Sequence, residues 1–334
     1  MKFELLPEPK LEFGDNFICE DPKKGISVGG FFSLTNQNHR SEIRISIIGT
    51  KNNIQDFKDW LTKMSNYIEA TAKSLKFDNE ASIQDGEVIS NYSGDIEDIQ
   101  SIAELFDDVE PTQTENIEFA INKKLNPDFI GFNKDSSFRC EFLNYELNNI
   151  EIKSQLIEAI VASDKSLIEK CDEIISIYKS AFRNHLENLN TKPDVCVIVI
   201  PTSVYKKLSS ISFGKGKLNF RRKLKAEILV CGSEIPVQLV LEDTILGKKK
   251  RQDDSMIAWN FVVAQYYKSD SIPWALTDID KNSCFVGISF HSVLGNENNL
   301  KRSSIAQAFN REGKGLIYVG KQFEWDAAKT KVRA

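Results

Sequence analysis

The feature of this sequence that most constrains its fold is one short run, residues 194–201, which reads Asp-Val-Cys-Val-Ile-Val-Ile-Pro. The run is rich in β-branched residues, which favour strands, and it is apolar at every position between the aspartate and the proline. Side chains of a strand point alternately to its two faces, so both faces of this strand must be covered by other elements. The run therefore predicts a buried strand inside a sheet rather than an edge strand.

Neighbouring segments supply the other parts of such a sheet. Residues 43–50 form a second β-branched run, and residues 138–143 and 235–241 indicate two further strands. After residue 50, apolar residues recur at helical spacing, namely Ile54, Phe57, Leu61, Met64 and Ile68. A long helix is expected from about Ser154 to about Asn188. The segment before residue 43 reads as short extended pieces broken by turn residues. Alternating strands and helices favour an α/β fold with a Rossmann-like first domain, residues 1–247.

A smaller second unit is expected over residues 248–334. Residues 255–268 have the pattern of a helix, residues 283–290 that of a strand, and residues 315–320 that of its hairpin neighbour. Such a unit is thin, and the sequence predicts an incomplete second domain.

Composition describes a soluble globular protein, since 41% of the 334 residues are apolar and 27% are charged. No apolar stretch approaches the roughly 20 residues that span a bilayer, and the N-terminus lacks the order of a secretory signal. We expect a cytoplasmic protein without a membrane partner. Six cysteines lie far apart and form no zinc-ligand spacing, which predicts reduced thiols; Cys196 and Cys284 lie in apolar runs, where cysteine usually packs in a core.

The net charge of −5 hides an uneven distribution. Residues 78–122 contain many acidic residues and no lysine or arginine, which predicts an exposed acidic insertion. Basic residues cluster between Lys206 and Lys225, and residues 248–251 form a second basic run. A local basic face can bind phosphate whatever the total charge. A solvated, charged helix face explains the same pattern, and composition leaves both interpretations open.

Four segments together resemble the short prokaryotic Argonautes. The most specific is AWNF at residues 258–261 with YYK at 266–268 and IPW at 272–274, and a second is CFVGISF at 284–290 with SIAQAFN at 304–310. Weaker ones are LPEPKLEFG at 6–14 with DPKKG at 21–25, and FIGF at 129–132 with FRC at 138–140. The resemblance implies a Rossmann-like MID domain, which holds the 5′-phosphate of a guide, followed by the N-terminal part of an RNase-H-like PIWI domain that appears truncated.

The family pattern places two phosphate-binding side chains one helical turn apart, then a glutamine on the next strand, then polar and basic residues on the next helix. Carried onto this chain, the pattern implies five guide-phosphate-binding residues: Arg221, Lys225, Gln238, Asn260 and Lys268. Arg221 departs from the usual aromatic or histidine residue at its position, which puts the preference for the first base in doubt. Simple solvation is the alternative, less favoured explanation for Lys225 and Lys268, and Gln238 and Asn260 also have ordinary structural explanations.

The resemblance also implies what the chain does not do. Cutting by Argonautes needs carboxylates that hold two metal ions, and Ser289 occupies the position of the first carboxylate. We therefore expect no catalytic residue, no catalytic metal, no enzymatic activity and no cofactor, and we leave Mg²⁺ at the guide 5′-phosphate open. The implied partners are a short guide RNA, an invading target DNA, and an APAZ-containing effector protein with a TIR, sirtuin-like or nuclease domain, which acts in prokaryotic defence.

Two other classes of function stay open. The first is a truncated Argonaute-like scaffold that binds no guide, and it predicts an exposed hydrophobic sheet edge and poor solubility without a partner. The second is a small-molecule α/β enzyme. Its only glycine-rich candidate is Gly214-Lys215-Gly216, which lacks a third glycine and a strong preceding strand, and no Walker-type loop is present. Ser203 and His185 offer no nucleophile-and-base spacing.

Overall fold

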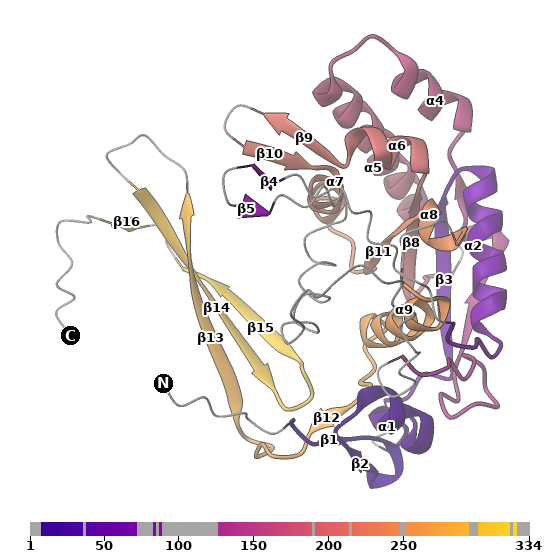
Figure 1. The fold of residues 1–334 in the computed structure, drawn as a ribbon, viewed down its shortest axis with the longest axis vertical. Helices are drawn as coiled ribbons and strands as arrows, with labels where there is room; N and C mark the ends of the chain where they lie inside the picture. Colours follow the sequence, from indigo (N-terminus) through magenta and orange to yellow (C-terminus); the bar gives the residue numbers. More distant parts are fainter. Residues whose placement is uncertain are drawn as a thin grey trace.

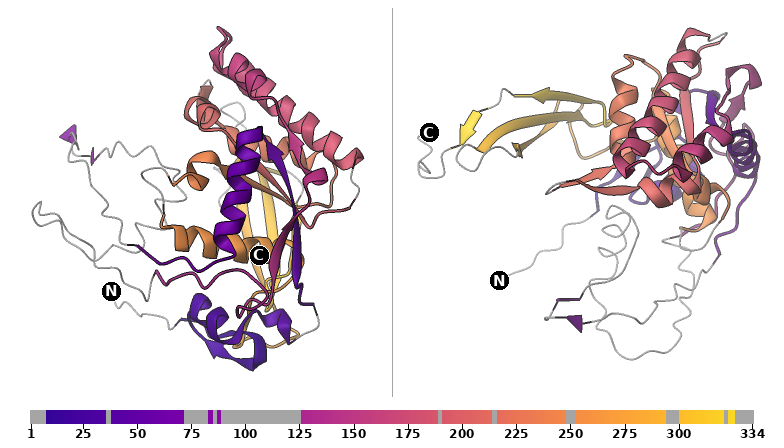
Figure 2. Two further views of the ribbon diagram at one scale, coloured as in Figure 1. Left: turned by 90° about the vertical axis from the view of Figure 1, so that its right-hand side faces the viewer. Right: turned by 90° about the horizontal axis from the view of Figure 1, so that it is seen from above.

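The fold is an α/β body from which an antiparallel sheet projects, as the computed structural model in Figures 1 and 2 shows. The structure describes residues 8–35, 38–71, 83–84, 87–88, 126–188, 191–213, 216–247, 252–293, 300–320 and 323–325. Most of the predicted acidic insertion, residues 78–122, and the basic run at 248–251 lie outside these residues; within the insertion only β4 (Ile83–Gln84) and β5 (Glu87–Val88) are described.

A parallel sheet forms the centre of the body. Its members are β3 (Glu42–Gly49), β6 (Glu141–Asn144), β7 (Ile150–Glu151), β8 (Val195–Ile200) and β11 (Val237–Leu241). The strand order is β11-β8-β3-β6, and β7 pairs with the end of β3. Every pairing in this sheet is parallel, so the predicted α/β fold with a Rossmann-like sheet is confirmed.

Strand β8 shows why its sequence is apolar throughout. Val195, Val197 and Val199 pack into a core on one face of the sheet. The alternate residues, Cys196, Ile198 and Ile200, pack into a second core on the other face. All six side chains are fully buried, because β8 lies between β3 and β11 and helices cover both faces.

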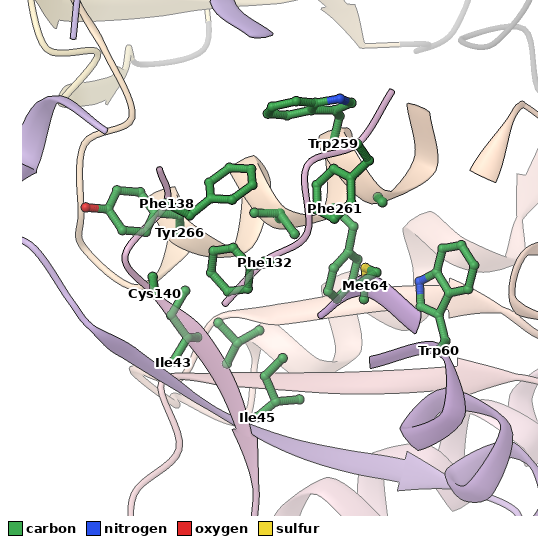
Figure 3. Close-up of a cluster of buried hydrophobic side chains, with 14 of the residues drawn as sticks. Ile43, Ile45, Trp60, Met64, Phe132, Phe138, Cys140, Trp259, Phe261 and Tyr266 are labelled. Carbon is green, nitrogen blue, oxygen red and sulfur yellow. The ribbon is translucent and has the colours of Figure 1, made fainter. Parts of the chain in front are cut away.

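The first face of the sheet carries α2 (Lys51–Met64) and α9 (Asp254–Lys268). Figure 3 shows how Trp60 and Met64 of α2 and Trp259, Phe261 and Tyr266 of α9 gather over the sheet. Helix α2 begins where the side chain of Thr50 accepts a hydrogen bond from the amide of Asn53. Ile68 was expected to continue this helix, but it lies beyond the helix end, in an isolated bridge to Phe129.

The second face carries α4 (Ser154–Ala162), α5 (Leu167–Glu187), α6 (Thr202–Leu208) and α7 (Phe220–Leu229). The prediction of one long helix from Ser154 to Asn188 is wrong, because the chain breaks between α4 and α5. The Ser166 hydroxyl caps α5 by accepting a hydrogen bond from the Glu169 amide, and the Glu169 carboxylate accepts one from the Ser166 amide. This capping box starts a new helix inside an otherwise continuous helical pattern.

The N-terminal segment is partly helical, which corrects the expectation of extended pieces only. Asp21 accepts hydrogen bonds from the amides of Lys23 and Lys24 and so caps α1 (Pro22–Gly29), which starts with a proline. Strand β1 (Leu11–Glu12) pairs with β2 (Ile18–Cys19) on one side and with β12 (Ala275–Leu276) on the other. Short helices complete the body: η1 (Gly14–Asn16), η2 (Phe32–Leu34), η3 (Glu146–Asn148) and α8 (Glu242–Ile245).

Two further antiparallel units are a small hairpin and the projecting sheet. A small hairpin, β9 (Ser210–Phe213) and β10 (Gly216–Asn219), lies between α6 and α7. The projecting sheet consists of β13 (Cys284–Val293), β14 (Leu300–Asn310), β15 (Gly315–Val319) and β16 (Phe323–Trp325). β15 was expected to pair with β13, but it pairs with the unpredicted strand β14. Cys284 is exposed, so its predicted place in a core is wrong.

Packing across the predicted domain boundary at residue 247 is extensive. Helix α9 follows that boundary in the sequence, yet Ala258, Trp259 and Val262 are buried in the core of the first face. Phe31 stacks on Tyr266 with ring centroids 3.6 Å apart, which ties the N-terminal segment to the same helix. The boundary itself stays a prediction.

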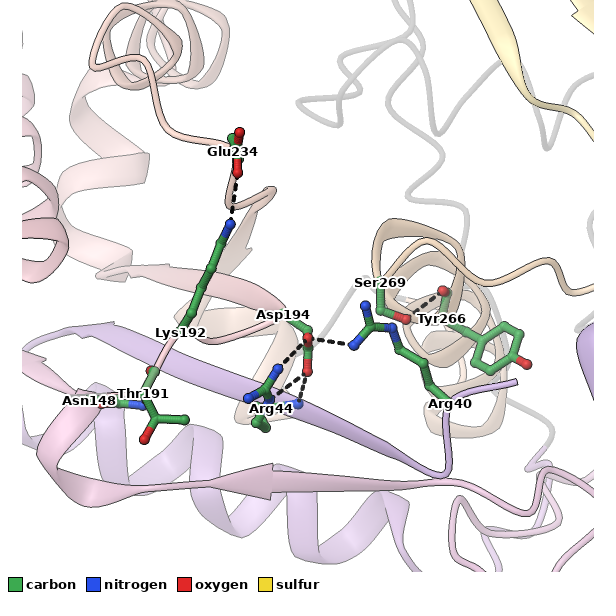
Figure 4. A network of polar contacts seen from close by, with 9 residues as sticks. All are labelled: Arg40, Arg44, Asn148, Thr191, Lys192, Asp194, Glu234, Tyr266 and Ser269. Atoms are coloured by element: carbon green, nitrogen blue, oxygen red, sulfur yellow. Dashed lines mark hydrogen bonds and ion pairs between the residues drawn. The ribbon is translucent and has the colours of Figure 1, made fainter. Parts of the chain in front are cut away.

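A polar network joins the N-terminal ends of β3 and β8 (Figure 4). Asp194 accepts hydrogen bonds from the Arg44 backbone amide at 2.8 Å and from the Arg44 guanidinium at 3.0 and 3.1 Å. Arg40 donates to the same carboxylate at 2.8 Å. Burial alone would raise the pKa of the Asp194 carboxyl, but the Arg44 hydrogen bonds and both arginine charges hold that pKa below its usual range.

Candidate phosphate-binding site

Lys268, the last residue of α9, is held against the first residues of β11. Its ammonium group donates to the side-chain oxygen Oε1 of Gln238 at 2.5 Å and to the backbone oxygen of Val237 at 3.0 Å. The Gln238 amide nitrogen in turn donates to the Leu239 oxygen at 3.1 Å, so the amide oxygen faces Lys268. Two of the five predicted site residues are therefore in direct contact.

Lys225 adds a second positive charge to this place. Burial, followed by repulsion from Lys225, lowers the pKa of Lys268 to about 8. Lys225 is exposed on α7, and Arg221 lies one turn earlier on the same helix and is half-buried. The structure thus joins Gln238 and Lys268 directly, and the charge of Lys225 is near enough to act on Lys268; Arg221 lies one turn from Lys225 on α7.

A small cavity beside Lys268 includes residues that the sequence patterns did not identify. The cavity has a volume of about 170 Å³, and Lys314 lines it together with Tyr267 and Asp270. Lys314 lies in the turn between β14 and β15, where its backbone amide donates to the Asn310 side chain at 2.9 Å. Lys314 is far from Lys268 in the sequence and belongs to no motif, so only the folded chain reveals their proximity.

Asn260 lies apart from this group. It precedes Lys268 by eight residues on α9, a separation of about 12 Å along a helix. Its side chain is exposed, donates to Gln252 at 3.4 Å, and lines a different cavity of about 1010 Å³ between α1, α9 and the start of the projecting sheet. The fold therefore does not bring Asn260 towards Lys268 and Gln238.

Ser289 lies in the middle of β13, opposite Ile305 of β14, and is exposed. Its hydroxyl carries no charge for a divalent ion. Among the described residues no three His, Cys, Asp or Glu side chains come together in a way that could hold a metal ion.

Carboxyl ends of parallel strands are common ligand sites in α/β sheets, and those of β8 and β11 are occupied by the chain itself. Glu242 follows β11 and accepts hydrogen bonds at 2.8 Å from the Thr202 amide and from the Asn53 side chain. The Thr202 hydroxyl donates to Asp243 at 2.6 Å. Carboxylates thus already use the first amide of α6, and their charge would repel an anionic ligand.

One serine–histidine pair exists in the body, although sequence spacing gave no sign of it. The Ser46 hydroxyl and Nε2 of His185 are 2.9 Å apart, and the two residues are 0% and 1% exposed. Burial lowers the pKa of His185, which favours the neutral ring. No substrate reaches this pair in the folded chain, so it has a structural role between β3 and α5.

Comparisons with known proteins give likenesses in fold only. No family model matches the chain, and no curated protein matches it. The similar solved structures are of Argonaute and Piwi proteins. One is Aa-Ago with externally bound siRNA, at 11% identity and a TM-score of 0.46, covering 98% of this chain and 33% of that chain. Another is Marinitoga piezophila Argonaute in complex with a 5′-OH guide RNA, at 10% identity and a TM-score of 0.42, covering 96% and 34%. A third is Drosophila Piwi, at 8% identity and a TM-score of 0.40, covering 95% and 30%.

The chain therefore spans about a third of the length of these proteins. Among the described residues, the helices are too short or too polar to cross a membrane.

Proposed function

We propose that this chain binds the 5′-phosphorylated end of a short guide nucleic acid at Lys268, Gln238 and Lys225. The observation that carries the proposal is the placement of Lys268. A half-buried ammonium group is held in a fixed direction by two carbonyl oxygens, next to a second ammonium group that repels it. A bound phosphate would relieve that repulsion and accept hydrogen bonds from both lysines.

A terminal phosphate differs from an internal one in a way that suits this site. A phosphate monoester carries about −1.5 to −2 charges at neutral pH and presents three strong acceptor oxygens. An internal phosphodiester carries one charge and has a strand on both sides. The Lys268 ammonium group lines a small cavity, and the charge of Lys225 acts on it, so this arrangement favours the end of a strand over its middle.

The finer parts of the proposal come from the resemblance of the sequence to the short prokaryotic Argonautes. We propose an RNA guide, a complementary DNA target, a role in prokaryotic defence, and an effector protein that target binding activates. We propose no cutting by this chain, because Ser289 stands where the first metal-binding carboxylate is expected. Mg²⁺ prefers oxygen ligands, whereas ammonium groups already supply positive charge at this site, so we propose phosphate binding without the ion.

A specific observation favours a second function, that of a scaffold without a guide. The projecting sheet exposes apolar side chains on β13 and β15, among them Val286 at 58%, Ile288 at 63% and Leu316 at 73%. Large exposed apolar patches commonly mark interaction surfaces. Under this alternative the chain would bind a protein through the sheet. Substitutions at Lys268 would then leave the affinity for RNA unchanged.

The test is the affinity of Lys268→Met for one RNA oligonucleotide with a 5′-phosphate. Loss of a charge-assisted contact should cost about 1.5–3 kcal/mol, or roughly 10- to 150-fold in Kd. The matched control is Lys10→Glu, an exposed lysine next to β1, which should leave the affinity nearly unchanged. Equal effects of the two substitutions would remove the assignment and favour the scaffold.

A further inference from the structure

A second pair of lysines lies on the second face of the parallel sheet, on α5 and α6, which the proposed guide site does not use. Lys170 of α5 and Lys207 of α6 both point at one atom, the backbone oxygen of Val161 near the end of α4. Their ammonium nitrogens are 3.1 Å and 2.6 Å from that oxygen. Since both nitrogens contact a single atom, the two positive charges must lie close together.

The need of the Val161 carbonyl for a hydrogen-bond donor explains the position of one lysine but not of two. It belongs to the last turn of α4, where carbonyl groups lack partners within the helix and a cation is favourable. One ammonium group satisfies that need. A second ammonium group at the same oxygen adds like-charge repulsion and gains only a shared acceptor.

The burial of Lys170, which is only 4% exposed, adds to the free-energy cost of holding two positive charges together. Buried charges are normally paired with an opposite charge. Among the described residues no carboxylate forms an ion pair with Lys170 or Lys207, and nearby Asp164 acts on Lys170 only through its charge. Glu169, the residue before Lys170, has its carboxylate bound to Ser166 in the capping box.

Burial, and then the neighbouring Lys207, lower the pKa of Lys170. The structure therefore holds two cationic groups whose mutual repulsion a bound anion would remove. Lys207 is exposed, so an anion can reach the pair from solvent without unfolding α5 or α6.

We propose that Lys170 and Lys207 bind a phosphate-class oxyanion at the junction of α4, α5 and α6. Each ammonium group has three N–H donors and uses one for Val161, so donors remain for the oxygens of the anion. The same chemistry is offered by inorganic phosphate or a small phosphate monoester, and by the phosphodiesters of a nucleic-acid strand. This site is separate from Lys225 and Lys268 and does not depend on the proposed guide site.

The test is residue-resolved acetylation of lysines in the full chain, followed by mass spectrometry. A short pulse of acetic anhydride is applied in sodium phosphate and in sodium chloride of equal ionic strength. At a phosphate concentration about ten times Kd, acetylation of Lys207 and Lys170 should slow about tenfold, because only the unoccupied protein reacts. Lys206, the exposed neighbour on α6, is the internal control and should keep its rate.

Variants make the test specific. Lys207→Ala should abolish the protection of Lys170 by phosphate, whereas the matched variant Lys206→Ala should leave it intact. Both residues are exposed on α6, so neither change threatens the fold. Lys225 and Lys268 are read in the same spectra, so failure of the guide site and failure of this site are seen separately.

A second arm identifies the source of the anion. An RNA oligonucleotide with a 5′-hydroxyl replaces phosphate at the same ionic strength. Protection by this RNA assigns the pair to a nucleic-acid strand, and protection by inorganic phosphate alone assigns it to a free phosphate or monoester. Absence of protection in both arms, or equal protection of Lys206, would overturn the proposal.

Discussion

At the residue scale, Lys268 is the side chain on which the proposed function depends most. Most lysines keep a pKa near 10.4 because water solvates their charge. Lys268 is half-buried at the end of α9 and faces another lysine, so its pKa falls to about 8. Its charge is therefore sensitive to pH in a range where a solvated lysine stays protonated.

The pH dependence of guide binding follows from that pKa. Below about pH 8 Lys268 is protonated and attracts the phosphate, which remains doubly charged above about pH 7. As pH rises above 8, Lys268 loses its proton and we expect the affinity for 5′-phosphorylated RNA to fall. Binding measured between pH 7 and 10 checks this, and Lys268→Arg should flatten the profile, because arginine stays charged. A fall of the same size in Lys268→Arg would contradict the role of Lys268.

The same pKa predicts a trend in stability without ligand. In the unfolded chain Lys268 keeps its usual pKa near 10.4, so between about pH 8 and 10 the unfolded state binds more protons than the folded state. The contribution of Lys268 to the free energy of unfolding should therefore rise with pH in this window. Lys268→Met should lose this rise, which urea unfolding at pH 8 and pH 9.5 measures. A rise of equal size in the variant would assign it to other groups.

Whereas Lys268 serves the proposed binding site, Asp194 is a single residue that stabilises the fold. Its side chain is only 7% exposed and holds Arg40 and Arg44, so Asp194→Ala should destabilise the protein by about 2–3 kcal/mol. Because its pKa is lowered, this stabilisation is present at neutral pH and is lost as pH falls through the acidic range. Glu234→Ala is the control, since the Lys192–Glu234 pair in Figure 4 is exposed and should contribute nothing measurable. Urea unfolding compares the two variants, and equal midpoints would contradict this account.

At the element scale, the close packing of α1 on β1 depends on one glycine. A Cβ atom added to Gly25 would lie 2.1 Å from Cε2 of the fully buried Phe13. We expect Gly25→Ala to displace Phe13 and destabilise the protein by about 1–3 kcal/mol, which thermal or urea unfolding can measure. Gly287→Ala is the matched control, because nothing lies within 4 Å of its added Cβ and its backbone is ordinary strand. Equal unfolding midpoints for the two variants would contradict the packing argument.

The elements also show what could be predicted from the sequence. Strand β8 and helix α2 were predictable, because their apolar residues repeat with the period of the element that they form. The break between α4 and α5 was not, since hydrophobic periodicity continues across it and only the Ser166–Glu169 capping box marks it. In strand β14, Leu300 is followed by four polar residues and then by a stretch with two alanines, so its pattern gave no clear strand signal.

The residues of the candidate site likewise divide into those whose proximity could be predicted from the sequence and those whose proximity could not. Arg221 and Lys225 share a helix, so their proximity follows from local spacing. The contact between Lys268 and Gln238 joins two elements separated by thirty residues, and only a resemblance to known proteins predicted it. Lys314 and the Lys170–Lys207 pair had no motif, because tertiary packing alone brings these residues into place.

At the scale of the whole molecule, the body and the projecting sheet differ in how they bury their side chains. In the body, both faces of the parallel sheet are covered by helices. In the projecting sheet, neighbouring residues of β13 that point to opposite faces, Phe285 and Val286, are both about half exposed. The sheet can therefore contact other molecules on either face, whereas the body is closed.

The exposed apolar side chains of the projecting sheet predict self-association of the isolated chain. Polar substitutions in the sheet should reduce it. Val286→Thr combined with Ile288→Thr should lower aggregation of the isolated chain with little change in Tm, because threonine favours strands and neither residue is buried. Light scattering and thermal unfolding measure the two effects. Val197→Thr, in the buried strand β8, should instead lower Tm. If the double substitution leaves aggregation unchanged, the sheet is not the surface responsible.

The most direct test of the central claim is binding of one RNA oligonucleotide with and without its 5′-phosphate, each at two salt concentrations. The account predicts clearly tighter binding of the phosphorylated RNA, and the preference should persist at the higher salt, because a fixed, half-buried site is screened less than a surface patch. Equal affinity for the two RNAs with a steep loss at higher salt, or no binding at all, would contradict a site for a guide 5′-end at Lys268.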